Sequence, residues 1–63
     1  MITYTQEING QSYWYFYDRS IRSWTVLKVD AEGNQEGEAE HYEHKNSLLK
    51  DYNFNFKNKL NEN

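Results

Sequence analysis

The chain of 63 residues contains no cysteine. This absence excludes a disulfide, a thiolate metal site and a cysteine nucleophile, all of which small proteins use for stability or catalysis. A domain of this length buries only about 60% of the surface of its unfolded chain, so it needs another source of stability. Large aromatic side chains can supply it, and they make up 17% of the sequence.

Long apolar runs and clustered positive charge are also missing. No stretch approaches the roughly 18 apolar residues that cross a bilayer, and residues 1–7 lack the basic and apolar segments of a signal peptide. The net charge of −3 disfavours unspecific binding to phosphate backbones. We therefore expect a cytoplasmic protein that binds neither membrane nor nucleic acid.

Five consecutive aromatic residues, Tyr-Trp-Tyr-Phe-Tyr, begin at position 13. Alternate side chains of a strand point to opposite faces of its sheet. Tyr13, Tyr15 and Tyr17 then share one face, here called the tyrosine face, and Trp14 and Phe16 lie on the other, the tryptophan face. Because both faces are rich in apolar surface, the run predicts a central strand in a sheet that is at least partly covered on both sides.

The dipeptide Asn9-Gly10 is the strongest local structural signal in the chain. Both residues tolerate the positive φ that a two-residue type I′ hairpin turn requires. The turn joins a first strand, residues 2–8, to the aromatic strand. Its geometry sets a register in which Tyr4 lies opposite Tyr15 on the tyrosine face.

Two further strands follow the aromatic one. Residues 24–30 are rich in β-branched and aromatic side chains, and residues 35–43 alternate in polarity. A four-residue loop, residues 19–22, precedes the third strand, and a turn with Gly33 in the left-handed conformation precedes the fourth. The glutamates of the fourth strand are typical of a sheet edge that resists pairing with other chains.

Residues 45–52 have the spacing of a short amphipathic helix whose apolar stripe includes Leu48 and Leu49. We expect Asn46 or Ser47 to cap its start. The fold class is therefore α+β and mainly β: a four-stranded antiparallel meander with one short C-terminal helix packed on a face.

We expect a single small domain over residues 1–57 and a frayed C-terminal tail over residues 58–63. Small residues lie opposite Trp14 and Phe16 and leave room for a helix. We therefore expect the helix on the tryptophan face, with Trp14 in the core. The tyrosine face is then the less covered one.

An exposed tyrosine face is the candidate interaction surface. Aromatic platforms of this kind form hot spots for protein partners. Its predicted residues are Tyr4, Tyr13, Tyr15, Tyr17, Trp24 and Val26. Two outcomes are open: either Phe54, Phe56 and Leu60 fold back over it, or a partner covers it, for example a second copy in a two-fold dimer.

Catalytic and metal-binding patterns find little support. The sequence has no Gly-rich phosphate loop and no Ser-His-Asp spacing, and a domain this small has little room for a pocket of about 300 Å³ or more. His41 and His44 point to opposite faces of a strand, which is poor geometry for a metal. We expect no enzymatic activity, no catalytic residue, no cofactor and no metal.

The chain is therefore interpreted as a small non-catalytic protein-interaction module. One alternative is an acidic inhibitor that mimics nucleic acid and binds a basic partner. Its acidic series is Asp30, Glu32, Glu36, Glu38, Glu40 and Glu43. The other alternative is a metal-binding protein that uses its histidines.

Overall fold

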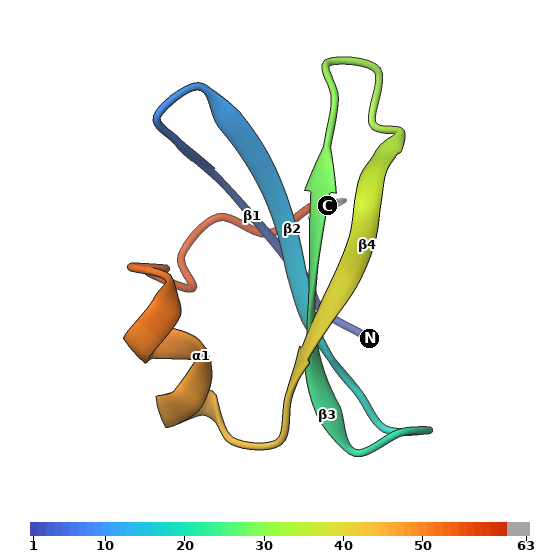
Figure 1. Ribbon diagram of the computed structural model, residues 1–63, viewed down its shortest axis with the longest axis vertical. Coiled ribbons are helices and arrows are strands. Elements are labelled where there is room, and N and C mark those ends of the chain that lie inside the picture. The colour runs from blue at the N-terminus through green and yellow to red at the C-terminus, as the bar shows by residue number, and fades with distance from the viewer. Residues whose placement is uncertain (61–63) are drawn as a thin grey trace.

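The computed structural model describes residues 1–60 and confirms the predicted meander. One antiparallel sheet contains four strands in chain order, and one helix follows them (Figure 1). The elements are β1 (Thr3–Ile8), β2 (Gln11–Asp18), β3 (Ser23–Val29), β4 (Gln35–Tyr42) and α1 (Lys45–Asp51).

The predicted turns and registers of the first three strands are confirmed. Asn9 and Gly10 have φ of 51° and 82°, as the type I′ turn requires. Tyr4 lies opposite Tyr15 in the β1–β2 ladder. The loop between β2 and β3 has the predicted length, so Tyr15 also lies opposite Val26.

β4 departs from regular alternation in its middle. The pairing runs from Lys28–Glu36 to Val26–Glu40, so one residue of β3 faces three residues of β4. Gly37 lies in this bulge with φ of 73°. A bulge bends an edge strand and discourages other chains from pairing with it, which adds to the effect of the glutamates. The alternating pattern of the sequence did not predict the bulge.

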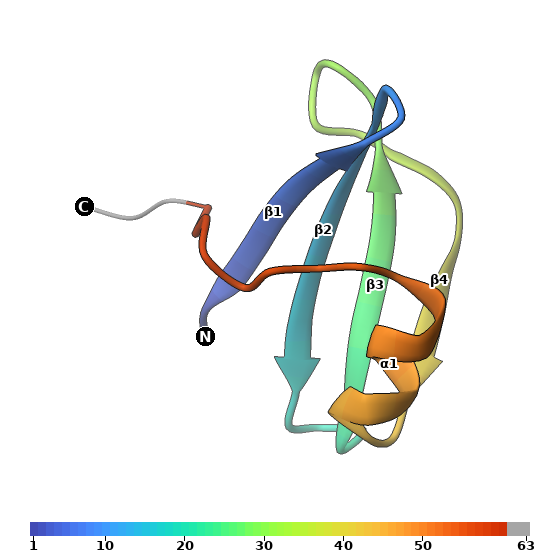
Figure 2. The ribbon, with the colours of Figure 1, turned by 90° about the vertical axis from the view of Figure 1, so that its left-hand side faces the viewer.

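The helix and the segment that follows it lie across one face of the sheet (Figure 2). That face is the tyrosine face, because the buried cluster combines its side chains with those of α1 and residues 52–60. The members of the core are Tyr15, Val26, Leu48 and Phe54.

The prediction that α1 covers the tryptophan face, with Trp14 in the core, is wrong. Helix and tail bury more apolar surface on the tyrosine face, which has the larger aromatic area. The tryptophan face is covered in part by the β3–β4 turn. A Cβ at Gly33 would lie 3.3 Å from the Trp14 ring, so the β3–β4 turn packs against this half-buried side chain.

Stacked aromatic rings join the tail to the sheet. The ring centroids of Phe54 and Tyr15 are 3.8 Å apart, and their planes differ by 7°. Phe56 meets Tyr15 edge to face with centroids 5.1 Å apart. Of the two outcomes that the sequence left open, the structure shows the tail folded back over the tyrosine face.

Gln6 ties the backbone of the tail to β1. Its amide oxygen accepts hydrogen bonds from the Asn55 N–H at 2.9 Å and from the Tyr15 hydroxyl at 3.2 Å. Its amide nitrogen donates to the Asn53 carbonyl at 3.3 Å. Gln6 interrupts the apolar side chains of β1, and these three bonds explain why a polar residue stands there.

The outer edge of β1 is also covered. The Thr5 N–H donates to the Asn58 carbonyl at 2.9 Å, and the Leu60 N–H donates to the Thr3 carbonyl at 2.7 Å. The frayed tail was expected from residue 58. Residues 58–60 instead pair with β1. Residues 61–63 lie outside the described part of the chain.

The helix begins earlier than the capping pattern predicted. His44 is the N-cap and its side chain makes no capping hydrogen bond, so the expected cap at Asn46 or Ser47 is wrong. A helix of seven residues is not stable through backbone propensity alone. Contacts with the sheet must therefore hold it.

Replacing Phe54 with alanine tests the role of the tail. We expect Phe54→Ala to lower the free energy of unfolding by about 3–5 kcal/mol, which is most of the stability of a domain of this size. Leu49→Ala is the matched control, because Leu49 is exposed; its effect should stay within about 0.5 kcal/mol. Urea unfolding followed by circular dichroism measures both, and equal effects would contradict the assigned core.

Two glycines provide an internally controlled test of the turns. Gly10 and Gly33 have similar φ, 82° and 85°, but only the Cβ of an alanine at position 33 would meet another side chain, that of Trp14. Gly10→Ala should cost about 1–2 kcal/mol from backbone strain alone. Gly33→Ala should cost more, because the Trp14 ring must also move. Denaturant unfolding that ranks them in reverse would contradict the packing of the turn on Trp14.

Candidate protein-interaction groove

Exposed apolar side chains gather at the end of the sheet where β1 begins and β2 ends. The exposed fractions are 88% for Met1, 52% for Ile2, 37% for Tyr17 and 49% for Ile21. Within residues 1–60, Leu49 on α1 is the one other large apolar residue of comparable exposure. The apolar surface is thus concentrated at one end of the molecule.

A groove of about 720 Å³ lies at this end of the sheet. Its lining consists of Met1, Ile2, Tyr4, Tyr17, Asp18, Arg19, Ser20 and Trp24. The volume lies within the range of about 300–1,000 Å³ that is usual for ligand sites. The prediction that the domain has little room for such a site is wrong, because strand ends and a loop enclose the space at the surface rather than in the interior.

The aromatic wall of the groove is supported from behind. Tyr17 and Trp24 are opposite each other in the β2–β3 ladder and pack edge to face, with ring centroids 5.5 Å apart. Phe56 of the tail packs against Trp24 with centroids 5.4 Å apart. The Lys45 ammonium lies 4.2 Å from the Phe56 centroid and 5.9 Å from that of Trp24, which adds cation–π attraction. The wall is therefore a preorganised apolar surface.

The polar rim of the groove follows the end of β2. The Asp18 carboxylate accepts hydrogen bonds from the Ser20 hydroxyl at 2.6 Å and from the Ser20 N–H at 3.0 Å. These bonds hold the pKa of the Asp18 carboxyl below its usual value, so it is ionised at neutral pH. His41 is not among the residues that line the groove, and its Nδ1 is 3.2 Å from the Thr25 hydroxyl.

The structure brings three of the six predicted interaction residues to the groove. Tyr4, Tyr17 and Trp24 all line it. Met1 and Ile2 complete its apolar part and were not among the predicted site residues. The register that pairs Tyr4 with Tyr15 puts position 2 opposite Tyr17, on the tyrosine face. This place at the far end of the tyrosine face could have identified Ile2 as a site residue.

The other three predicted residues lie beneath α1 and the tail. Tyr15 and Val26 are fully buried, and Tyr13 packs against Tyr52 and Phe54 with centroids 5.2 and 5.6 Å apart. In this fold Tyr15 and Val26 are withdrawn from the surface, whereas Tyr13 is half-buried. The tail covers the middle of the tyrosine face, where the second open outcome placed a partner or a second copy.

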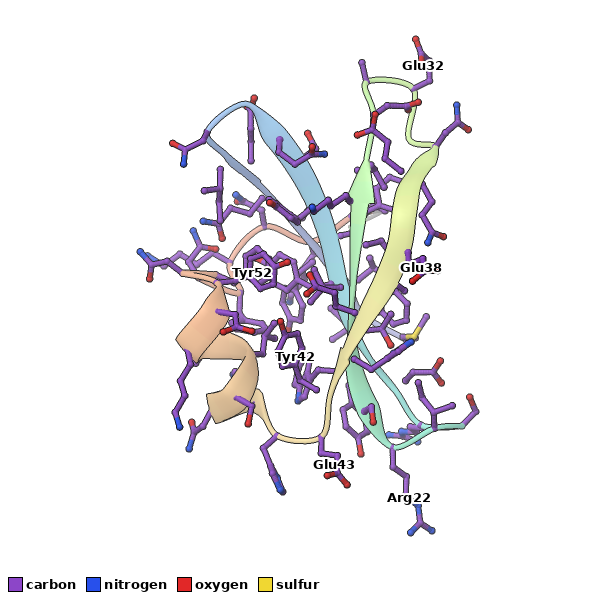
Figure 3. The ribbon with its side chains drawn as sticks, viewed as in Figure 1. Arg22, Glu32, Glu38, Tyr42, Glu43 and Tyr52 are labelled. Carbon is purple, nitrogen blue, oxygen red and sulfur yellow. The ribbon has the colours of Figure 1, made fainter. Side chains whose placement is uncertain are left out.

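The acidic and histidine alternatives gain no specific support. Among residues 1–60, no three His, Asp or Glu side chains are placed to hold a metal ion. Asp30 accepts hydrogen bonds within the β3–β4 turn, and Glu36 accepts one from the Gln11 side chain. Glu32 and Glu43, labelled in Figure 3, are exposed. Asp30 and Glu36 of the acidic series therefore make hydrogen bonds within the domain.

Two tyrosine hydroxyls fasten the helical segment to β4. Tyr42 of β4 donates a hydrogen bond to the Asp51 carboxylate at 2.8 Å, and Tyr52 donates one to the Glu40 carboxylate of β4. Both rings lie between α1 and the sheet (Figure 3). Burial, and then the hydrogen bond to a carboxylate, raises the pKa of both hydroxyls well above the usual value.

No protein-family model matches the chain, and no match is found among curated proteins or among solved structures. No helix in residues 1–60 is long and apolar enough to cross a membrane. The function of the groove therefore has to be inferred from its own chemistry.

The raised tyrosine pKa values predict a loss of stability at high pH. The unfolded chain releases these protons near pH 10, whereas the folded chain retains them to higher pH. The contribution is fully present below about pH 10 and is lost as the pH rises through the folded-state values. Urea unfolding between about pH 8 and 11 should show this decline, and Tyr42→Phe and Tyr52→Phe should each reduce its slope.

The matched control for this measurement is Tyr17→Phe, which removes an exposed hydroxyl outside the α1–β4 contact. Burial also raises the pKa of Tyr15, so some slope should persist when Tyr42 and Tyr52 are both replaced. A pH dependence that is unchanged in the double variant would show that the two tyrosine–carboxylate bonds do not stabilise the fold.

Proposed function

We propose that the protein is a small, non-catalytic interaction module that binds a short segment of another protein in the groove. One observation carries this proposal: within residues 1–60, three of the five exposed large apolar side chains, those of Met1, Ile2 and Tyr17, line the groove. Exposed apolar side chains that gather beside polar ones are typical of a protein-binding site.

The residue types at the groove support protein binding. Interface hot spots are enriched in Tyr, Trp and Arg, and they combine an apolar centre with a polar rim. Tyr17 and Trp24 form the apolar wall here, and Arg19 stands at the rim. The Ser20 hydroxyl and N–H both donate to the Asp18 carboxylate and close a local turn at the rim, so these polar groups shape the loop beside the groove.

The size of the groove favours a short partner segment. A volume of about 720 Å³ accommodates a few side chains rather than an extended protein surface. A second copy of the chain is the alternative occupant, because the same exposed residues could meet their own symmetry mates. Mimicry of nucleic acid by β4 is not favoured, since Glu36 and Glu40 make hydrogen bonds within the domain.

Selection from a random displayed-peptide library tests the proposal. The folded full chain should enrich peptides with an apolar anchor, and Leu49→Ser should enrich the same family because it changes an exposed apolar residue away from the groove. The double variant Ile2→Ser with Tyr17→Ser should enrich none of them. Peptides retained equally by the double variant, or no enrichment on the wild type, would contradict the proposal.

Sedimentation velocity at several concentrations distinguishes between the two possible occupants of the groove, a segment of another protein and a second copy of the chain. A monomer at all concentrations is expected for a module that binds another protein. A dimer that Ile2→Ser abolishes and Leu49→Ser preserves would instead identify a second copy as the occupant.

A further inference from the structure

We propose that Asn9 is a site of spontaneous deamidation and that the isoaspartate product loosens the hairpin of β1 and β2. The inference is independent of the proposed function, because this turn lies at the end of the hairpin opposite the groove. Three observations carry it: the residue that follows Asn9, the exposure of the turn, and the unpaired backbone N–H at its tip.

The reaction joins one backbone nitrogen to the preceding side chain. The Gly10 nitrogen bonds to the side-chain carbonyl carbon of Asn9, the bond from that carbon to the amide nitrogen breaks, and ammonia leaves with the Gly10 proton. Water then opens the cyclic succinimide at one of its two carbonyls and gives aspartate or isoaspartate. No oxidant or metal takes part, and water is the only co-reactant. Asparagine is one of the thermolabile residues of proteins.

The Gly10 nitrogen is accessible to this attack. Asn9 is the one asparagine of the chain that is followed by glycine, which has no side chain to hinder the ring closure. Both residues are exposed, and a Cβ at Gly10 would have nothing within 4 Å. Among residues 1–60, the Gly10 N–H donates to no backbone carbonyl of a turn or loop. The turn lies at the end of the sheet away from α1, so water reaches it freely (Figure 1).

Local opening of the hairpin end permits the ring to close. Asn9 has φ of 51° in the turn and must leave this conformation for its side chain to meet the Gly10 nitrogen. Only the last pair of the ladder, Ile8 opposite Gln11, has to separate. Loops and the ends of elements open at little free-energy cost. Folding should therefore slow the reaction at Asn9 by about tenfold or less relative to the unfolded chain.

Asn46 is a matched control within the same chain. It is followed by Ser47, the next smallest residue after any asparagine here, and both are exposed. The Ser47 N–H, however, donates to the His44 carbonyl at 3.1 Å in the first turn of α1. The helix holds this nitrogen away from the Asn46 side chain. Folding should therefore prevent deamidation at Asn46 but not at Asn9.

Isoaspartate changes the backbone of the turn, whereas aspartate does not. In isoaspartate the main chain runs through the former side chain, which adds one methylene group to the two-residue loop. The geometry of this loop sets the register in which Tyr4 lies opposite Tyr15. Asp-Gly suits the same type I′ turn as Asn-Gly. Asn9→Asp therefore separates the effect of the new charge from the effect of the altered backbone.

Incubation of the full chain in mildly alkaline buffer, folded and in urea, tests the site. Peptide mapping by mass spectrometry and enzymatic methylation of isoaspartate follow the products. In the folded chain Asn9 should convert while Asn46 stays intact, and in urea both should convert, with Asn9 the faster. An Asn9 that stays intact in the folded chain while it converts in urea would overturn the proposed site. Equal conversion of Asn46 and Asn9 in the folded chain would overturn it as well.

Urea unfolding of the separated products tests the structural consequence. The isoaspartate form should have a lower unfolding midpoint than the unmodified chain. Asn9→Asp should unfold at nearly the same urea concentration as the unmodified chain. Equal midpoints for the isoaspartate form and Asn9→Asp would show that the added methylene group does not loosen the hairpin.

Discussion

The stack of Phe54 on Tyr15 is the contact on which the rest of the structure depends. It places an aromatic ring from the end of the chain flat against the centre of the sheet, with centroids 3.8 Å apart. This contact brings the tail within reach of the Gln6 amide and encloses Leu48 of α1. Without it the tyrosine face would be open, and a helix of seven residues would have too little support to persist.

The same contact determines where the apolar surface remains uncovered. Within residues 1–60, one short helix and one extended segment are available to cover an aromatic sheet face. The extended segment crosses the middle of the face, and α1 lies over β3 and β4 (Figure 2). The end of the face, at Ile2 and Tyr17, extends past them and stays exposed. The groove is thus the uncovered end of the tyrosine face, and Trp24 belongs both to its wall and to the packing around Phe56.

Turn residues and strand patterns were sufficient to predict the sheet. They were not sufficient to predict which face the helix and the tail cover. Asn9-Gly10 specifies one turn geometry, and that geometry determines the pairing of Tyr4 with Tyr15. The choice of covered face depends on contacts between residues far apart in the chain, and both faces are apolar enough to be covered. Phe56 has φ of 55°, which is rare for a bulky residue, and no local pattern indicates it. The three lining residues that were predicted lie within strands, and the five that were missed lie at the N-terminus, at the last residue of β2 and in the loop after it.

Core and groove are energetically coupled through the tail. Phe56 packs against Tyr15 in the interior and against Trp24 in the groove wall, and the Lys45 ammonium lies over its ring. Residues that fold the domain therefore also hold the wall of the groove in place. Rigid aromatic side chains lose little conformational entropy on binding, so a small wall can contribute more affinity than its area suggests. A substitution that loosens the tail weakens the groove without changing its lining, because the order of Trp24 depends on Phe56.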